Sequence, residues 1–251
     1  MKKNWNFILK LICFYIVLFI LFKFGIVYMS DNFMNNDITN KTYGIGEVIT
    51  SEKYSKDKIK ETNYLKYKEF KIKDYIEDFE LDDSDYNYQY YVNTKMDKNT
   101  ALMIGIFQTR IDEINNYDKD SIYVELNHFP IYISKTSRNK FLEKHNIKND
   151  VDLIKYIRSR EKHKYNIFTP TTKIKEEYFY NFIEYNMPSL DKIYYIEGDK
   201  TGYIFVDDDM KQISLIKNDK LYVIRLYNLE YFNDEVIKDI INSAIISKKK
   251  S

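Results

Sequence analysis

The sequence of 251 residues contains little cysteine, glycine or proline, and each shortage excludes a class of protein. A single cysteine, Cys13, excludes a disulfide scaffold and a cysteine-rich zinc site. Six glycines and three prolines are too few for a collagen-like or proline-rich protein. Neither sign of charge dominates, because 39 Lys and Arg residues balance 38 Asp and Glu residues, so the composition predicts no nucleic-acid partner.

Aromatic residues are abundant. They make up 17% of the chain, with 25 Tyr and 16 Phe. This content argues against global disorder, because disordered chains have few side chains that can form a core. We therefore expect a folded domain.

The clearest pattern is an apolar segment near the N-terminus. An unbroken run of 12 apolar residues, Leu11 to Phe22, becomes the 23 residues 7–29 when Lys10 and Lys23 are included. A helix of that length extends about 34 Å, enough to cross a hydrocarbon core of about 30 Å. The long stems of the two lysines can carry their ammonium groups to the lipid headgroups. The segment therefore predicts a transmembrane anchor in contact with the lipid bilayer.

Two other interpretations of this segment stay open. Lys2, Lys3 and Lys10 before 12 apolar residues also fit a cleaved signal peptide. Residues 23–30, however, contain no A-x-A-like cleavage site, which favours the uncleaved anchor. The third interpretation is a buried core helix.

The charges that flank the segment predict its orientation. Its N-terminal side carries Lys2, Lys3 and Lys10 and no acidic residue, whereas residues 30–49 carry one lysine and three acidic residues. Positive flanks favour the cytoplasm, so the N-terminus is expected inside and the remainder outside. The prediction is a single-pass protein of a bacterial cell membrane with an extracytoplasmic C-terminal domain.

The chain divides into five predicted regions. They are a cytoplasmic N-terminus (1–6), the anchor (7–29), a polar stalk or linker (30–60), a folded domain (61–247) and a basic tail (248–251). The stalk is polar and weakly periodic, with one possible strand at Gly46–Thr50. The domain is long enough to bury a core without disulfides or metals.

The first half of the domain is predicted to form strands and the middle to form helices. Strands are predicted at Tyr88–Val92, Ala101–Thr109, Ile122–Leu126 and Ile131–Ser134. Three helices are predicted to follow: one capped by Thr136 or Ser137 and ending near Asn146, one capped by Asn149 or Asp150, and one at Thr172–Asn186. The second helix should bury Val151, Leu153, Ile154 and Ile157.

The last sixty residues predict an antiparallel meander and a closing helix. The strands are expected at Lys192–Glu197, Gly202–Val206, Gln212–Lys217 and Leu221–Tyr227, separated by short polar turns. Asn233 should cap the helix, whose apolar rows begin with Val236 and Ile237 and should pack across the sheet. The fold class is therefore α+β, with a mainly antiparallel sheet and helices packed on one face.

Two short motifs resemble those of penicillin-binding proteins and serine β-lactamases. Ser137-Arg138-Asn139-Lys140 has the S-x-x-K form and Lys200-Thr201-Gly202 has the K-T-G form. No S-x-N or Y-x-N element lies between them, and the separation of about 60 residues is too short for the usual intervening domain. We interpret both matches as coincidence and predict no catalytic residue.

Metal and cofactor sites are not predicted either. Asp83–Asn87 begins like a calcium loop but has Tyr88 where glycine is needed and Thr94 where a glutamate is needed. Asp207–Asp209 is interpreted as a solvated turn. The spacing of the three histidines fits no zinc site; they are His128, His145 and His163.

Two groups of residues are candidate binding surfaces. One is a basic patch of Lys155, Arg158, Arg160, Lys162, His163 and Lys164, which could meet an anionic polymer or lipid headgroups. The other consists of aromatic clusters that could stack on sugars or peptides: Tyr88, Tyr90, Tyr91 and the run Tyr178–Tyr180. The basic patch also fits a solvated helix end, and the aromatic clusters also fit a core or a neutral surface.

The function expected from these patterns is binding without catalysis. The extracytoplasmic domain should bind an envelope component or a protein partner. One alternative is an envelope hydrolase or acyl-transferase that uses Ser137 or His128. Another is a membrane-anchored immunity or exclusion protein, which the size and the anchor permit but no residue requires.

Overall fold

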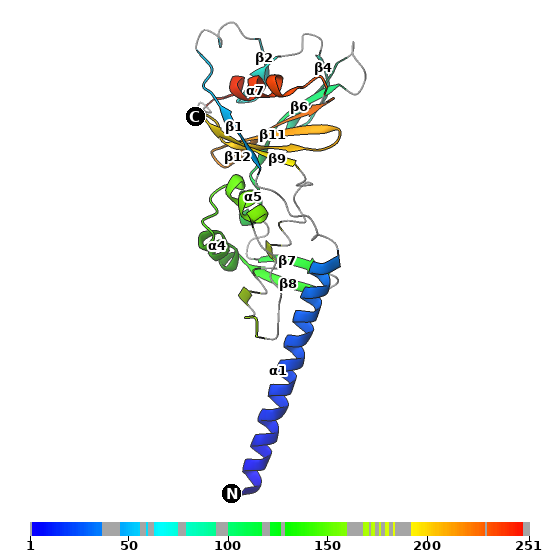
Figure 1. The fold of residues 1–251 in the computed structure, drawn as a ribbon, viewed down its shortest axis with the longest axis vertical. Coiled ribbons are helices and arrows are strands. Elements are labelled where there is room, and N and C mark those ends of the chain that lie inside the picture. Colours follow the sequence, from blue (N-terminus) through cyan, green and yellow to red (C-terminus); the bar gives the residue numbers. More distant parts are fainter. Residues whose placement is uncertain are drawn as a thin grey trace. The chain divides into compact units, whose positions relative to one another are not determined.

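A computed structural model of the chain contains two compact units (Figure 1). The first comprises residues 1–42, 118–141 and 160–187, and the second comprises 43–117, 142–159 and 188–251. The structure describes residues 2–36, 46–55, 59, 63–74, 79–93, 100–116, 121–126, 129–159, 168–170, 172–173, 176, 179–180, 183, 192–228 and 230–247.

The first unit contains the long helix α1 (Lys2–Asn36), drawn in blue in Figure 1. Its segment Trp5–Gly25 is long and apolar enough to cross a membrane, with a mean hydropathy of 2.5. None of this segment is buried within the protein. A core helix would bury most of such side chains, so their exposure favours the anchor or signal interpretation over the core helix.

The first unit also contains the hairpin of β7 (Ser121–Leu126) and β8 (Phe129–Ser134), which leads into α4 (Lys135–Lys144). The Ser137 amide donates to the Ser134 hydroxyl over 3.2 Å, so the cap is Ser134. The predicted cap at Thr136 or Ser137 is wrong, because the strand runs directly into the helix. Part of the predicted helix 172–186 lies outside the described residues; residues 172, 173, 176, 179, 180 and 183 are helical.

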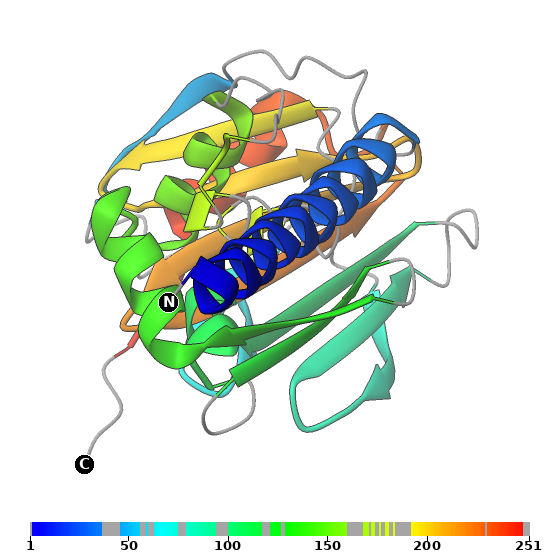
Figure 2. The same cartoon turned by 90° about the horizontal axis from the view of Figure 1, so that it is seen from below.

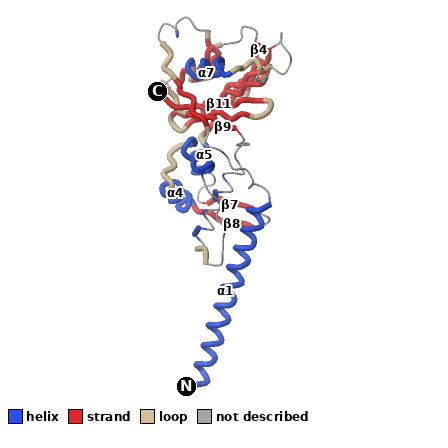
Figure 3. The backbone as a smooth tube through the Cα atoms, in the orientation of Figure 1, coloured by secondary structure: helices blue, strands red, loops and turns tan. Residues whose placement is uncertain are grey.

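The second unit is built on a mixed sheet of eight strands in the order β1-β9-β10-β11-β12-β6-β5-β4. Figures 2 and 3 show these strands side by side. The strands are β1 (Glu47–Ser51), β4 (Phe79–Ser84), β5 (Tyr88–Asn93), β6 (Ala101–Gln108), β9 (Lys192–Gly198), β10 (Gly202–Val206), β11 (Met210–Lys217) and β12 (Lys220–Tyr227). Only the β1–β9 pair is parallel. The predicted meander, β9 to β12, is confirmed.

Local turns fix the register of the meander. Asn218 and Asp219 connect β11 to β12, and both have positive φ angles, of 50° and 58°. Two consecutive positive φ angles match the twist of a two-residue hairpin, and Asn and Asp adopt them more readily than other non-glycine residues. This turn pairs Lys217 with Lys220 and sets the alternation of faces along both strands.

A second, smaller sheet contains β2 (Tyr64–Tyr67), β3 (Phe70–Lys73) and β13 (Ile245–Ile246) in the order β13-β3-β2. The Ser247 amide extends this pairing with a 2.9 Å bond to the Glu69 carbonyl. Residues 245–247 therefore lie beside the β2–β3 hairpin.

One face of the large sheet packs against α7 (Asp234–Ser243). Asn233 caps this helix as predicted, because its side chain accepts from the Val236 amide over 3.0 Å. The buried isoleucines of the helix share one apolar cluster with alternate residues of the strands; the helix side consists of Ile237, Ile240 and Ile241. The prediction that the closing helix packs across the sheet is confirmed.

The other face of the sheet packs against α5 (Asp150–Ser159), which contacts β10. Asn149 caps α5, and the four predicted apolar residues of this helix are buried. In α5, the Nζ of Lys155 lies 4.9 Å from the ring centre of Tyr195. The next residue of the strand, Ile196, belongs instead to the apolar cluster that contains the buried isoleucines of α7. Since neighbouring residues of a strand point to opposite faces, α5 and α7 lie on opposite faces (Figure 1).

The prediction that helices cover one face is therefore wrong. Strand β10 is apolar and buried on both faces: Tyr203, Ile204 and Phe205 are consecutive and all buried. Such strands need cover on both sides. The domain boundaries, including the stalk at 30–60, stay predictions, although residues 47–51 of that range form β1.

The core beneath α7 generates the first prediction. Ile241 is fully buried, so Ile241→Ala should lower the free energy of unfolding by about 3 kcal/mol through lost burial and a residual cavity. The measurement is urea denaturation followed by circular dichroism. Lys238→Ala on the exposed side of the same helix is the control and should change stability by less than about 0.5 kcal/mol. Equal effects of the two changes would contradict this packing.

Candidate functional site

The structure places the two β-lactamase-like motifs in different units. Ser137 lies in α4, with its hydroxyl 3.0 Å from that of Ser134 at the start of the helix. Lys200 belongs to the second unit, where its Nζ donates to Asp199 Oδ2 and to the Asn242 carbonyl, each over 3.0 Å. Both side chains therefore have local structural partners. His128 lies outside the described residues.

The carboxylates of the two acidic clusters accept hydrogen bonds from residues of their own turns. The Tyr88 hydroxyl donates to Asp83 over 3.0 Å, and the Tyr86 amide donates to Asp85 over 2.5 Å. In the second cluster the Asp208 amide donates to Asp207 over 2.9 Å. Within the described parts of the chain, no group of three or more His, Cys, Asp or Glu residues could hold a metal ion.

The predicted basic patch is described only in part. Lys155 forms an ion pair with Glu197 at 3.1 Å, and residues 160–164 lie outside the described residues. Of the aromatic candidates, Phe179 and Tyr180 are buried, while Tyr178 is outside the described residues. Tyr90 packs edge-on against Tyr227, with ring centres 6.0 Å apart. These aromatics serve packing more than they form a shared surface.

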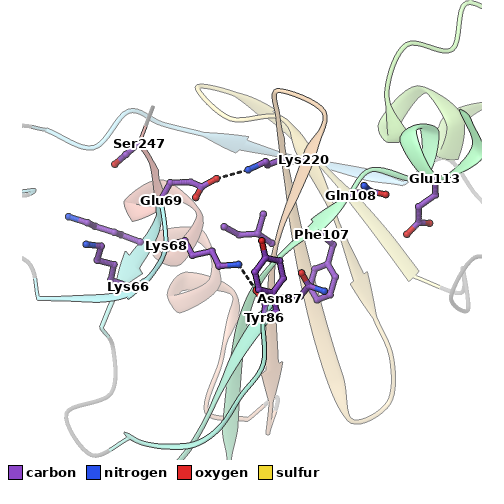
Figure 4. Close-up of a pocket in the computed structure, with 12 residues that line it drawn as sticks. Lys66, Lys68, Glu69, Tyr86, Asn87, Phe107, Gln108, Glu113, Lys220 and Ser247 are labelled. Atoms are coloured by element: carbon purple, nitrogen blue, oxygen red, sulfur yellow. Dashed lines mark hydrogen bonds and ion pairs between the residues drawn. The ribbon is translucent and has the colours of Figure 1, made fainter. Parts of the chain in front are cut away.

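A cleft of about 1190 Å³ lies in the second unit, at a place that the sequence analysis missed (Figure 4). Its walls come from the β2–β3 hairpin, the β4–β5 turn, the end of β6, the helix α3 (Arg110–Asn116), the start of β12 and the residue after β13. The lining residues are Lys66, Lys68, Glu69, Lys71, Tyr86, Asn87, Ile106, Phe107, Gln108, Glu113, Lys220 and Ser247.

The lining carries a local excess of positive charge. Four lysines and two glutamates give it a formal charge of +2, whereas residues 30–251 as a whole carry 35 basic and 38 acidic residues. The cleft is therefore a basic site on a weakly acidic domain. Such a local excess attracts an anionic group without making the whole surface basic.

Two of these lysines face each other across the hairpin. Lys66 of β2 and Lys71 of β3 are register partners, between the pairs Leu65–Ile72 and Tyr67–Phe70. Because strand residues alternate between faces, these apolar pairs point to the core and the lysine pair points outward. No ion pair joins either lysine to a described residue. Like charges at opposed positions destabilise a hairpin, so an anion between them would be stabilising.

Lys68 and Tyr86 form the centre of the cleft. The Lys68 ammonium lies 3.9 Å from the ring centre of Tyr86 and donates to its carbonyl, which also accepts from the Tyr67 hydroxyl. Lys68 has a φ angle of 51°, in the left-handed region that costs a non-glycine residue about 1 kcal/mol or more. Tyr86 is 81% exposed. An aromatic surface therefore stands open beside a fixed cation.

An ion pair closes another edge of the cleft. Lys220 binds Glu69 at 2.7 Å, and this hydrogen bond is the main reason that the pKa of Lys220 is raised. Burial, with a smaller contribution from Glu69, raises the pKa of Tyr222. Figure 4 shows Glu69 and Lys220 reaching toward each other from different elements. The pair joins the β2–β3 hairpin to β12.

A buried carboxyl group holds the helix that carries Glu113. Asp150 is fully buried and accepts from the amides of Arg110 and Ile111, over 2.9 and 3.2 Å, at the start of α3. Arg110 in turn binds Glu113 at 2.9 Å. Burial raises the pKa of the Asp150 carboxyl to about 6, although the two amide bonds oppose this shift. Asp150 thus anchors one wall of the cleft without lining it.

The arrangement suits binding. The described lining contains four ammonium groups, two carboxylates, amide side chains, a serine hydroxyl and aromatic rings. Ammonium groups recognise anions through charge-assisted hydrogen bonds, and rings stack on flat or apolar faces of a ligand.

Of these lining residues, only Tyr86 and Asn87 belong to a candidate site considered from the sequence, the rejected calcium loop at Asp83–Asn87. The other lining residues come from segments whose proximity depends on strand pairing.

The raised pKa of Asp150 predicts a specific pH dependence of stability. Since the folded-state pKa is about 6 and the ordinary value is 3.8, the folded protein binds more protons between these values than the unfolded chain. The contribution of Asp150 to stability is therefore full below about pH 4, and it falls by about 3 kcal/mol as pH rises through 6.

Urea denaturation between pH 4 and pH 7 tests this dependence. Asp150→Asn should flatten the profile over this range, because the amide does not titrate. Asp152→Asn in the same helix is the control and should leave the fall with pH in place. An unchanged profile in Asp150→Asn would contradict the assignment.

The bond from Tyr67 to the Tyr86 carbonyl predicts a local effect. Tyr67→Phe should cost about 1 kcal/mol of unfolding free energy, because the carbonyl loses one buried donor. It should also increase amide hydrogen exchange in the β4–β5 turn, measured by mass spectrometry. Tyr231→Phe, outside the cleft, should leave exchange in that turn unchanged.

Comparison with known proteins adds no family or relative to these observations. Neither a scan against protein-family models nor a search of curated proteins finds a match. The function therefore has to be argued from the residues of this chain.

Proposed function

We propose that the protein is a single-pass membrane protein whose extracytoplasmic domain binds an envelope component or a protein partner, without catalysis. The observation that carries this proposal is the basic cleft, with the opposed Lys66 and Lys71 and the open ring of Tyr86. A protein keeps such an arrangement at a cost in stability, which is reasonable when a ligand compensates for it.

The anchor supports the membrane part of the proposal. Trp5–Gly25 is long and apolar enough to span a bilayer, and its side chains contact no core. Lysines before the segment and acidic residues after it favour an inside N-terminus. Such an arrangement would hold the binding domain at the outer surface of the membrane.

Binding is better supported than hydrolysis or acyl transfer. A serine nucleophile needs a base within hydrogen-bond reach, whereas the hydroxyl of Ser137 lies beside that of Ser134 at the start of α4. The immunity or exclusion hypothesis shares the anchor and the binding domain, and it differs only in the kind of partner.

Labelling of intact cells tests the topology. In a Cys13→Ala background, Ser251→Cys should react with a membrane-impermeant maleimide at the mass of the full-length chain, because the C-terminus should lie outside. Lys3→Cys in the same background is the control and should react only after lysis. Labelling of Ser251→Cys at a reduced mass would show that the apolar segment is a cleaved signal and not an anchor. Labelling only after lysis would show that the C-terminus lies inside the cell.

A further inference from the structure

We propose that the basic cleft binds an anionic polymer of sugar units, with one anionic group between Lys66 and Lys71 and an adjoining sugar ring on Tyr86. This inference rests on the proposed binding function and names the class of its ligand. The shared chemistry is a repeated phosphate or carboxylate group next to a sugar ring.

The opposed lysines supply the anion site. Side chains at directly opposed positions start about 5 Å apart at Cβ, so two flexible ammonium groups can converge on one phosphate or carboxylate. Lys66 is exposed and Lys71 is half-buried, and no described acid neutralises either. The other lysines of the cleft already have partners: Lys220 has Glu69, and Lys68 has Tyr86. The anion should therefore prefer the Lys66–Lys71 pair.

The exposed ring of Tyr86 supplies the second contact. The backbone at Tyr86 is held by two donors, because its carbonyl accepts from Lys68 (Figure 4) and from Tyr67. The ammonium of Lys68 lies over one face of the ring, 3.9 Å from its centre, so a sugar would stack on the opposite face. Phe107 adds a further aromatic side chain to the same lining.

The size of the cleft favours an extended ligand. Pockets of about 300–1000 Å³ enclose a drug-sized molecule, and this cleft of about 1190 Å³ is open to solvent. A single phosphate would occupy the lysine pair and leave the aromatic part empty. A polymer can fill both parts and extend beyond them.

Other anionic partners fit the cleft less well. A nucleic acid is expected to require a broad basic face, whereas residues 30–251 carry three more acidic than basic residues. An anionic membrane surface would also require a broad basic face. A local basic cleft with one open ring suits a chain that enters the cleft.

Binding of the full-length protein in detergent micelles tests the proposal by isothermal titration calorimetry. Polygalacturonate is the carboxylate probe, a polymer of ribitol phosphate with sugar substituents is the phosphate probe, and dextran is the neutral control. We expect at least one anionic probe to bind, with an affinity that falls as salt increases, and dextran to bind far more weakly. The stronger of the two anionic probes identifies which anionic group the site prefers.

Matched variants locate the binding site. Lys66→Gln/Lys71→Gln should weaken binding about tenfold or more, whereas Lys53→Gln/Lys192→Gln, with the same loss of charge outside the cleft, should weaken it less than about twofold. Tyr86→Ala should weaken binding about fivefold or more. Phe168→Ala, which removes another highly exposed aromatic ring outside the cleft, should have no effect. Circular dichroism confirms that each variant is folded.

Several outcomes would overturn the inference. Equal losses in the cleft and control variants would show that net charge alone attracts the polymer. Tighter binding to single-stranded DNA, or to micelles that contain an anionic lipid, would assign the cleft to another class of partner if Lys66→Gln/Lys71→Gln abolishes it. If no polymer binds but a protein partner cross-links to Lys71, the inference fails and the proposed function stands. An inward-facing domain in the labelling experiment would instead refute the proposed function, whatever the purified protein binds.

Discussion

The antiparallel pairing of β6 with β12 is the contact on which the rest of the second unit depends. It joins residues 101–108 to residues 220–227, with Ile104 opposite Ile224 and Leu102 opposite Leu226. Through this pairing the C-terminal meander and the strands β4 to β6 become one sheet. The same pairing brings the start of β12 beside the end of β6, so that Lys220 and Gln108 are opposed and both line the cleft. The pairing therefore supplies both the continuous core and one wall of the candidate site.

A row of polar residues on one face of the large sheet leads to Asp150, the residue that binds the start of α3. The face opposite α7 carries a polar row in which Arg225 binds Gln212 over 2.8 Å and Gln212 binds Ser214 over 3.2 Å. Tyr203 and Asp150 continue this row, and the main reason for the raised pKa of Asp150 is its burial. A buried carboxyl group is tolerated here because two amides at the start of α3 bind it. Its position thereby fixes the helix that carries Glu113.

The cleft combines features that stability alone would not select. Opposed Lys66 and Lys71 repel each other, and Lys68 occupies a left-handed conformation that glycine or asparagine would adopt more easily. Tyr86 leaves most of its ring in solvent. Each feature costs free energy in the unliganded protein. Their concentration in one place is the physical reason to assign a ligand to this cleft rather than to the predicted basic patch or the aromatic runs.

The sequence by itself determined the local features of this protein. Periodicity and turn chemistry were enough to predict the apolar N-terminal helix, the four strands of the meander, and the helix that Asn233 begins. These features depend on residues a few positions apart. Tertiary structure alone decided that β1 joins β9 in parallel, that helices cover both faces of the large sheet, and that six separate segments line the cleft. The reason is that pairing between distant strands is set by the competition of many apolar surfaces, and no short segment of the sequence encodes that competition.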